Sequence, residues 1–149
     1  MLHKKFLTSV LNVGVLCVVI FFVSAHFVYA EKFIGYVLVA LAALCLWTLR
    51  FFNVTVKSVK PDIVFGVIDN GILAVMAVAG GELAGVAGAV VGGVVGNAIT
   101  DGIAGLFEGY SAEKGALDRR TIIGSAVGKM AGCLLGAGVV LIGATLFHY

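Results

Sequence analysis

The sequence predicts an all-α protein, a polytopic membrane helix bundle of about five transmembrane helices with glycine-rich close packing. Hydrophobic residues make up 61% of the 149-residue chain and charged residues 12%, which leaves too little polar surface to cover a soluble domain. Apolar runs of the length that a spanning helix needs, about 17 to 25 residues, occupy nearly the whole sequence. We therefore expect the protein to lie in a lipid bilayer.

The apolar runs set the expected elements in order. They cover residues 6–30, 33–49, 62–79, 83–107 and 121–147. The links between them are a short turn at Glu31 and Lys32, a basic segment over 50–60, a tight turn at 80–82 and a polar loop over 108–120. Residues 1–60 would hold two N-terminal helices and the basic segment, and residues 61–149 a three-helix, glycine-rich core with the intramembrane acids.

The first run has two readings. Lys4 and Lys5 precede it, and Val28-Tyr29-Ala30 resembles the cleavage site of a signal peptide. Its apolar core is long for a signal peptide, which favours a retained membrane helix. Cleavage would leave four helices. The first two runs are rich in large apolar residues, which suits helices that face lipid.

Small residues recur at four-residue spacing in the last two runs. The stripes are Gly88, Gly92 and Gly96 in the fourth run and Gly124, Gly128, Gly132 and Gly136 in the fifth. Such stripes let helix backbones approach closely in a membrane, where van der Waals contacts and weak CH to oxygen bonds hold them. They predict a tight bundle, and either a homodimer through the second stripe or packing within one chain.

Basic residues predict the orientation. Eight of them fall on one side of a five-helix arrangement: Lys4, Lys5, Arg50, Lys57, Lys60, Lys114, Arg119 and Arg120. Lys32 falls on the other side. Because basic loops stay in the cytoplasm, we expect a multi-pass protein of a cell inner or plasma membrane, with the N-terminus inside and the C-terminus outside.

Two acids lie within the apolar runs. Asp69 is in the third run and Asp101 in the fourth. A charge inside a bilayer costs roughly 2.5 to 3.5 kcal/mol even on insertion scales, so an acid held there usually has a task. Counted from the cytoplasmic ends, both acids lie about 9 to 10 Å deep, and Lys129 about 12 Å deep. The three groups are expected to share one layer.

Further oxygen donors accompany these acids. Asn70 follows Asp69, Thr100 could add a hydroxyl, and Asn97, Asp101 and Glu108 share one helix face. Carboxylate and amide oxygens are ligands for hard cations such as Ca²⁺, and Na⁺ is a second candidate. The predicted metal ligands are Asp69, Asn70, Asn97, Asp101 and Glu108. Lys129 is expected to pair with the acids when no ion is bound. The alternative is a buried structural network that fixes helix register.

The order of these motifs resembles the transmembrane protein 65 family. The resemblance covers residues 62–143 and rests on the Asp69-Asn70 segment, the Asn97 to Asp101 segment, and Gly128-Lys129 with the glycines that follow. It implies a dimeric membrane protein linked to sodium-dependent calcium export in mitochondria. The ion-binding positions that it carries over are Asp69, Asn70, Asn97 and Asp101. This chain departs from the family at Gly80-Gly81-Glu82 and has a shorter loop over 108–120.

The chain also resembles the vacuolar iron transporter family. The similar residues are Phe65-Gly66 with Asp69, the small-residue turn, and the segment 107–111. This resemblance implies a five-helix dimer that exchanges a divalent metal for protons. The acidic cytoplasmic extension that collects metal in that family is reduced here to Glu108, Glu113 and Asp118. Both resemblances imply movement of divalent cations.

Other classes of function are less well supported by the residues. A membrane scaffold or assembly protein, with Asp69, Asp101 and Lys129 in a buried network, is the alternative to a transporter. The sequence has no nucleophile beside a base, no histidine cluster and no phosphate-binding loop in its required setting. We therefore expect no enzyme. Positive-inside topology explains the short basic segment, so no nucleic-acid partner and no cofactor other than a bound ion is expected.

Overall fold

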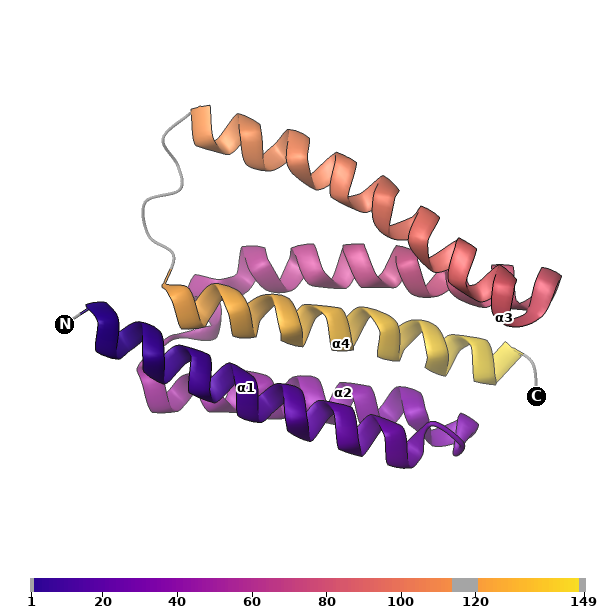
Figure 1. The fold of residues 1–149 in the computed structure, drawn as a ribbon, viewed down its shortest axis with the longest axis horizontal. Coiled ribbons are helices and arrows are strands. Elements are labelled where there is room, and N and C mark those ends of the chain that lie inside the picture. Colours follow the sequence, from indigo (N-terminus) through magenta and orange to yellow (C-terminus); the bar gives the residue numbers. More distant parts are fainter. Residues whose placement is uncertain (1, 114–120, 148–149) are drawn as a thin grey trace.

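The computed structural model describes the backbone of residues 2–113 and 121–147 and the side chains of residues 4–30, 32–106 and 121–147. Its long helices are α1 (Leu2–Phe27), α2 (Glu31–Thr48), α3 (Lys60–Glu113) and α4 (Ile122–Phe147). Two short 3-10 helices, η1 (Leu49–Phe52) and η2 (Val56–Val59), join α2 to α3. Figure 1 shows the resulting bundle, which confirms the predicted all-helical fold. Within the described residues, four helical segments are long and apolar enough to span a membrane.

Helix α3 reverses direction part-way along its length. Ala84 (φ −142°, ψ 25°) and Gly85 (φ 59°, ψ −141°) leave helical geometry, and the chain turns back on itself there (Figure 1). We call residues 60–83 the first arm of α3 and residues 86–113 the second arm. The turn expected at 80–82 is wrong, because those residues continue the first arm. Gly85 takes the turn because its positive φ is open to glycine at no steric cost.

Helix α4 lies between α2 and the first arm of α3 (Figure 1). Ala42 and Cys45 of α2 are fully buried against α4, where Val127 and Ala131 are also fully buried. The expectation that α2 simply faces lipid is therefore wrong for this face of the helix. Small side chains one turn apart let α2 approach α4, and Gly35 and Gly138 extend that close contact.

Both glycine stripes pack within the chain. On α4, a β-carbon built on Gly132 would lie 3.0 Å from Gly66 Cα, and one built on Gly136 would lie 2.9 Å from the Gly71 nitrogen. On the second arm, one built on Gly96 would lie 3.0 Å from Leu73 Cα. The other stripe glycines also meet first-arm atoms or residues close to its start: Gly88, Gly92, Gly124 and Gly128. A homodimer is thus not needed to fill either stripe.

Several basic segments share one end of the bundle. The N-terminus, the connection between α2 and α3, and the start of α4 lie together in Figure 1. Exposed basic residues of these segments are Lys4, Lys5, Arg50, Lys57 and Lys60. Exposed Lys32 follows the turn between α1 and α2, at the opposite end. Lys114, Arg119 and Arg120 lie outside the described residues.

Candidate functional site

Asp69 lies in the seam between the two arms of α3. Its side chain is 8% exposed, and its Oδ1 accepts a hydrogen bond from the hydroxyl of Thr100, which is 4% exposed. The glycine stripe sets this register. Gly96 lies against Leu73, so in antiparallel arms the residue one turn after Gly96 faces the residue one turn before Leu73. The close approach of the backbones therefore gives the buried carboxylate its donor.

Asn70 joins this carboxylate to α4. Its Nδ2 donates to Asp69 Oδ2 at 3.1 Å and to the Cys133 sulfur at 2.7 Å. The amide has two N–H groups, enough for both bonds. Cys133 was not among the predicted site residues, although its position one turn after Lys129 is a signal that could have pointed to it. The candidate site thus draws on both arms of α3 and on α4.

Asn97 and Asp101 form a second pair on the second arm. Asn97 Nδ2 donates to Asp101 Oδ2 at 2.8 Å, across one helical turn. Asn97 is half-buried, whereas Asp101 is exposed. Thr100 touches both pairs, because its hydroxyl oxygen also lies 3.0 Å from the carbonyl oxygen of Asn97. The two acids therefore occupy neighbouring surfaces, with Asp69 inside the seam and Asp101 outside it.

The remaining predicted ligand is not placed. Glu108 belongs to the second arm of α3, but its side chain is outside the part of the structure that is described. Lys129, the predicted charge partner, is half-buried on α4, and its Nζ lies 4.9 Å from the centroid of the Phe65 ring. Phe65 precedes Asp69 by one turn on the first arm of α3.

Asp62 is a buried acid at the start of the third apolar run and is not one of the predicted metal ligands. Its side chain is 2% exposed and accepts a hydrogen bond from the Ser125 hydroxyl at 2.9 Å. An acid in the first turn of a helix is usually explained by the helix dipole. The sequence feature that could have indicated the burial of Asp62 is on α4, where the polar residue Ser125 precedes Lys129 by one turn.

The oxygen donors around Asp69 suit hard cations, but they do not form a complete coordination shell. Asp69 provides a carboxylate, Thr100 a hydroxyl and Asn97 a backbone carbonyl, all oxygen donors that Ca²⁺ and Na⁺ accept. Within the described residues, no group of three or more His, Cys, Asp and Glu side chains is arranged to hold a metal ion. A cation at Asp69 would thus depend on neutral oxygens or on a second copy of the chain.

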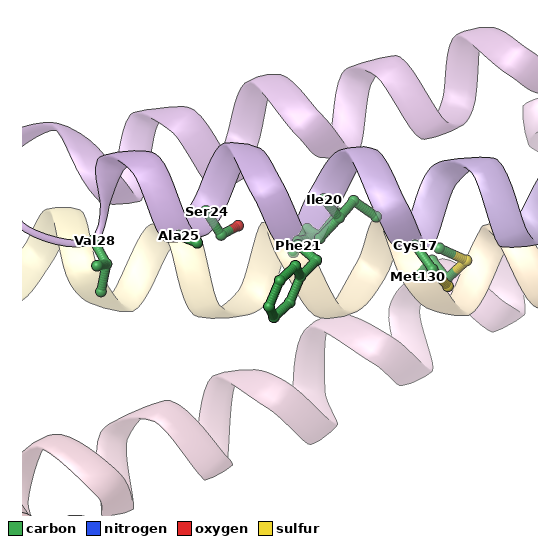
Figure 2. A pocket seen from close by; sticks show the side chains of 8 residues that line it. Cys17, Ile20, Phe21, Ser24, Ala25, Val28 and Met130 are labelled. Atoms are coloured by element: carbon green, nitrogen blue, oxygen red, sulfur yellow. The ribbon is translucent and has the colours of Figure 1, made fainter.

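An open groove elsewhere on the bundle has different chemistry. Figure 2 shows side chains of α1 and α4 that line it. Its volume is about 610 Å³. Its lining is almost entirely apolar, from residues such as Ile20, Phe21, Met130 and Leu134. None of its lining residues carries a carboxylate.

Comparison with protein-family models, with curated proteins and with solved structures found no match for this chain. The resemblances described above therefore rest on the residues quoted for them.

Proposed function

We propose that this protein is an integral membrane transporter that moves a divalent cation, with Ca²⁺ exchanged for Na⁺ as the leading case. The buried carboxylate of Asp69 carries the proposal. It is 8% exposed and lies where two arms of one apolar helix meet α4. Keeping an ionisable group at such a depth is costly, and intramembrane acids with polar neighbours mark ion or proton pathways by default.

Asp69 and Asn70 form the inner part of the proposed cation site, and Asn97 and Asp101 the outer part. Thr100 supports this division because its hydroxyl contacts Asp69 and the Asn97 carbonyl together. A cation that moves between the pairs would exchange oxygen ligands without passing through a purely apolar layer. Glu108, further along the second arm, would receive the ion at the cytoplasmic mouth.

The proposed topology has five spans, because the two arms of α3 each have enough residues to cross a bilayer. At 1.5 Å per residue, the 24 residues of the first arm extend about 36 Å, against a hydrocarbon core of about 30 Å. Exposed basic residues at one end of the bundle support a cytoplasmic N-terminus in an inner or plasma membrane.

A homodimer would complete the outer pair. Asp101 is exposed between Ile99 and Ile103, which are 49% and 48% exposed. A carboxylate on such a surface is costly next to lipid. A second copy that covers the outer face of the second arm would shield Asp101 and double the number of oxygen ligands. Cysteine crosslinking between Ala98→Cys copies in membranes tests this arrangement, and Val139→Cys on exposed α4 surface is the control.

Flux through proteoliposomes tests the transport proposal. Purified protein is reconstituted and Ca²⁺ movement is measured under a Na⁺ gradient for wild type, Asp69→Asn and Asp101→Asn. Glu82→Gln, an acid-to-amide change outside the site, is the matched control. We expect a loss of at least about tenfold in both Asp variants, because changing even an outer-shell partner of a metal ligand costs about 10- to 100-fold, and normal flux in the control. Size-exclusion profiles establish that each variant is folded.

The same assay separates the alternatives. Flux of Fe²⁺ driven by a proton gradient, without Na⁺-driven Ca²⁺ flux, would favour a metal and proton exchanger. Absence of flux with every ion and gradient would leave the scaffold alternative, in which Asp69 and its partners fix helix register. Normal Ca²⁺ flux in folded Asp69→Asn would refute the site.

A further inference from the structure

Two buried acids lie on the same face of the first arm. Asp62 is 2% exposed and Asp69 is 8% exposed. Seven residues separate them, which returns a helix to nearly the same face after about 10 Å of rise. Of these two acids, only Asp69 has a role in the function proposed above.

Helix α4 carries a row of polar residues on the side that packs against this face. Ser125, Lys129 and Cys133 follow at four-residue spacing. Ser125 donates to Asp62, and Cys133 accepts from Asn70 beside Asp69. A β-carbon built on Gly128 would lie 3.0 Å from Asp62 Cβ, so the backbone next to Lys129 is packed directly against Asp62.

Lys129 contacts the ring of Phe65, a residue that lies between the two acids along the first arm. Its Nζ is 4.9 Å from the centroid of Phe65, which follows Asp62 by three residues and precedes Asp69 by four. Along the helix axis these separations correspond to about 4.5 Å and about 6 Å. A lysine carries its charge on a flexible four-carbon stem, so a change of rotamer moves the charge toward either acid.

Charge balance links the position of Lys129 to cation binding at Asp69. One ammonium can neutralise one carboxylate at a time, and a buried carboxylate without a counter-charge is strongly unfavourable. When Lys129 neutralises Asp62, Asp69 therefore favours binding of another cation. When Lys129 turns to Asp69, it competes with that cation directly.

We propose that Lys129 is an internal counter-ion shared by Asp62 and Asp69, and that arrival of a cation at Asp69 moves Lys129 onto Asp62. This inference rests on the proposed transport function and adds its regulation. Asp62 is a positioning residue that acts through Lys129 and does not bind the transported ion. The affinity of the Asp69 site is set by how strongly Asp62 holds Lys129.

Equilibrium binding of ⁴⁵Ca²⁺ to the full chain in detergent tests the proposal. Asp62→Asn leaves Lys129 at Asp69 and is expected to weaken binding about tenfold, within the usual range of coupling between sites. Lys129→Met removes the competitor and is expected to tighten binding by a similar factor. The double variant should bind like Lys129→Met, because Asp62 has no lysine left to hold. Lys32→Met controls for loss of a positive charge elsewhere.

The outcomes are distinct. Wild-type affinity in Asp62→Asn, or weakened binding that persists in the double variant, overturns the shared counter-ion while the transport proposal stands. Failure of wild type to bind Ca²⁺ overturns both. Thermal unfolding identifies any variant that is not folded, and Asp62→Ser and Lys129→Gln then replace the first pair in the same comparison.

Discussion

Thr100 donates a hydrogen bond to Asp69 across the two arms of α3, although 31 positions of sequence separate them. The bond joins a buried hydroxyl to a buried carboxylate, in the register that the packing of Gly96 against Leu73 sets. Asp69 thus has a structural contact as well as a proposed role in cation binding.

Replacing Thr100 by Val should destabilise the protein. The valine keeps the shape but removes the donor, and leaving a buried acceptor less satisfied costs about 1 to 3 kcal/mol. Thermal or denaturant unfolding in detergent measures the change. Thr145→Val is the matched control, because the Thr145 hydroxyl lies 3.0 Å from the Leu141 carbonyl oxygen of its own helix. An equal loss in both variants would contradict a special role for the contact between the arms.

Gly66→Ala should separate α3 from α4. A β-carbon there would lie 2.6 Å from the Lys129 carbonyl oxygen and 2.8 Å from the Cys133 nitrogen. These are backbone atoms that cannot rotate away, so we expect a loss of about 1 to 3 kcal/mol in the free energy of unfolding.

Gly71→Ala is the control for that loss. It lies on the same arm, and a β-carbon there has no heavy neighbour within 4 Å among the described residues. Alanine is the better helix former by up to about 1 kcal/mol, so this variant should be as stable as wild type or more stable. Lower stability in Gly71→Ala than in Gly66→Ala would contradict the packing.

Gly85→Ala should strain the reversal of α3. The residue has φ 59° and ψ −141°, a region that side chains rarely adopt, and forcing alanine into it costs about 1 to 3 kcal/mol. Gly81→Ala is the comparison, because its β-carbon would make an ordinary 3.5 Å contact with Ala89 Cβ. Both variants are measured by unfolding in detergent, and equal stability of the two would place the reversal elsewhere.

Ca²⁺ should protect Cys133 from a thiol reagent. Cys133 accepts a hydrogen bond from Asn70, which also bonds Asp69, so an ion there would hold the three side chains in place. If labelling needs the ion-free state, its rate falls about tenfold at ten times the dissociation constant. The rate is measured by mass spectrometry in Cys45→Ala protein. Exposed Cys17 should react at one rate with or without Ca²⁺, and an unprotected Cys133 would argue against a site at Asp69.

The lengths of the apolar runs predicted the all-helical fold, because helix formation in such runs depends on local sequence. The position of the reversal in α3 was predicted wrongly. Polar Glu82 and its glycine neighbours indicated a turn at 80–82, but the backbone turns at Gly85, where the arms can still align Gly96 with Leu73. Which of several nearby glycines makes a turn depends on that packing and not on local propensity.

The sequence predicted a depth for each candidate site residue, which stays a prediction, but not the direction in which its side chain points. Counting residues put Asp69, Asp101 and Lys129 near one layer, yet Asp69 faces the seam and Asp101 faces outward. Direction depends on how each helix is rotated against its neighbours. The same limit hid Asp62, which is buried and accepts a hydrogen bond from Ser125, 63 positions away in the sequence.

The reversal at Ala84 and Gly85 also bears on biogenesis in the proposed membrane topology. It leaves almost no linker between the arms, so they would leave the translocon as one helical hairpin. Asp69 would then reach the hydrocarbon together with Thr100, its own hydrogen-bond donor. The carboxylate would have a hydrogen-bond donor from its own hairpin during insertion, before α4 packs against it.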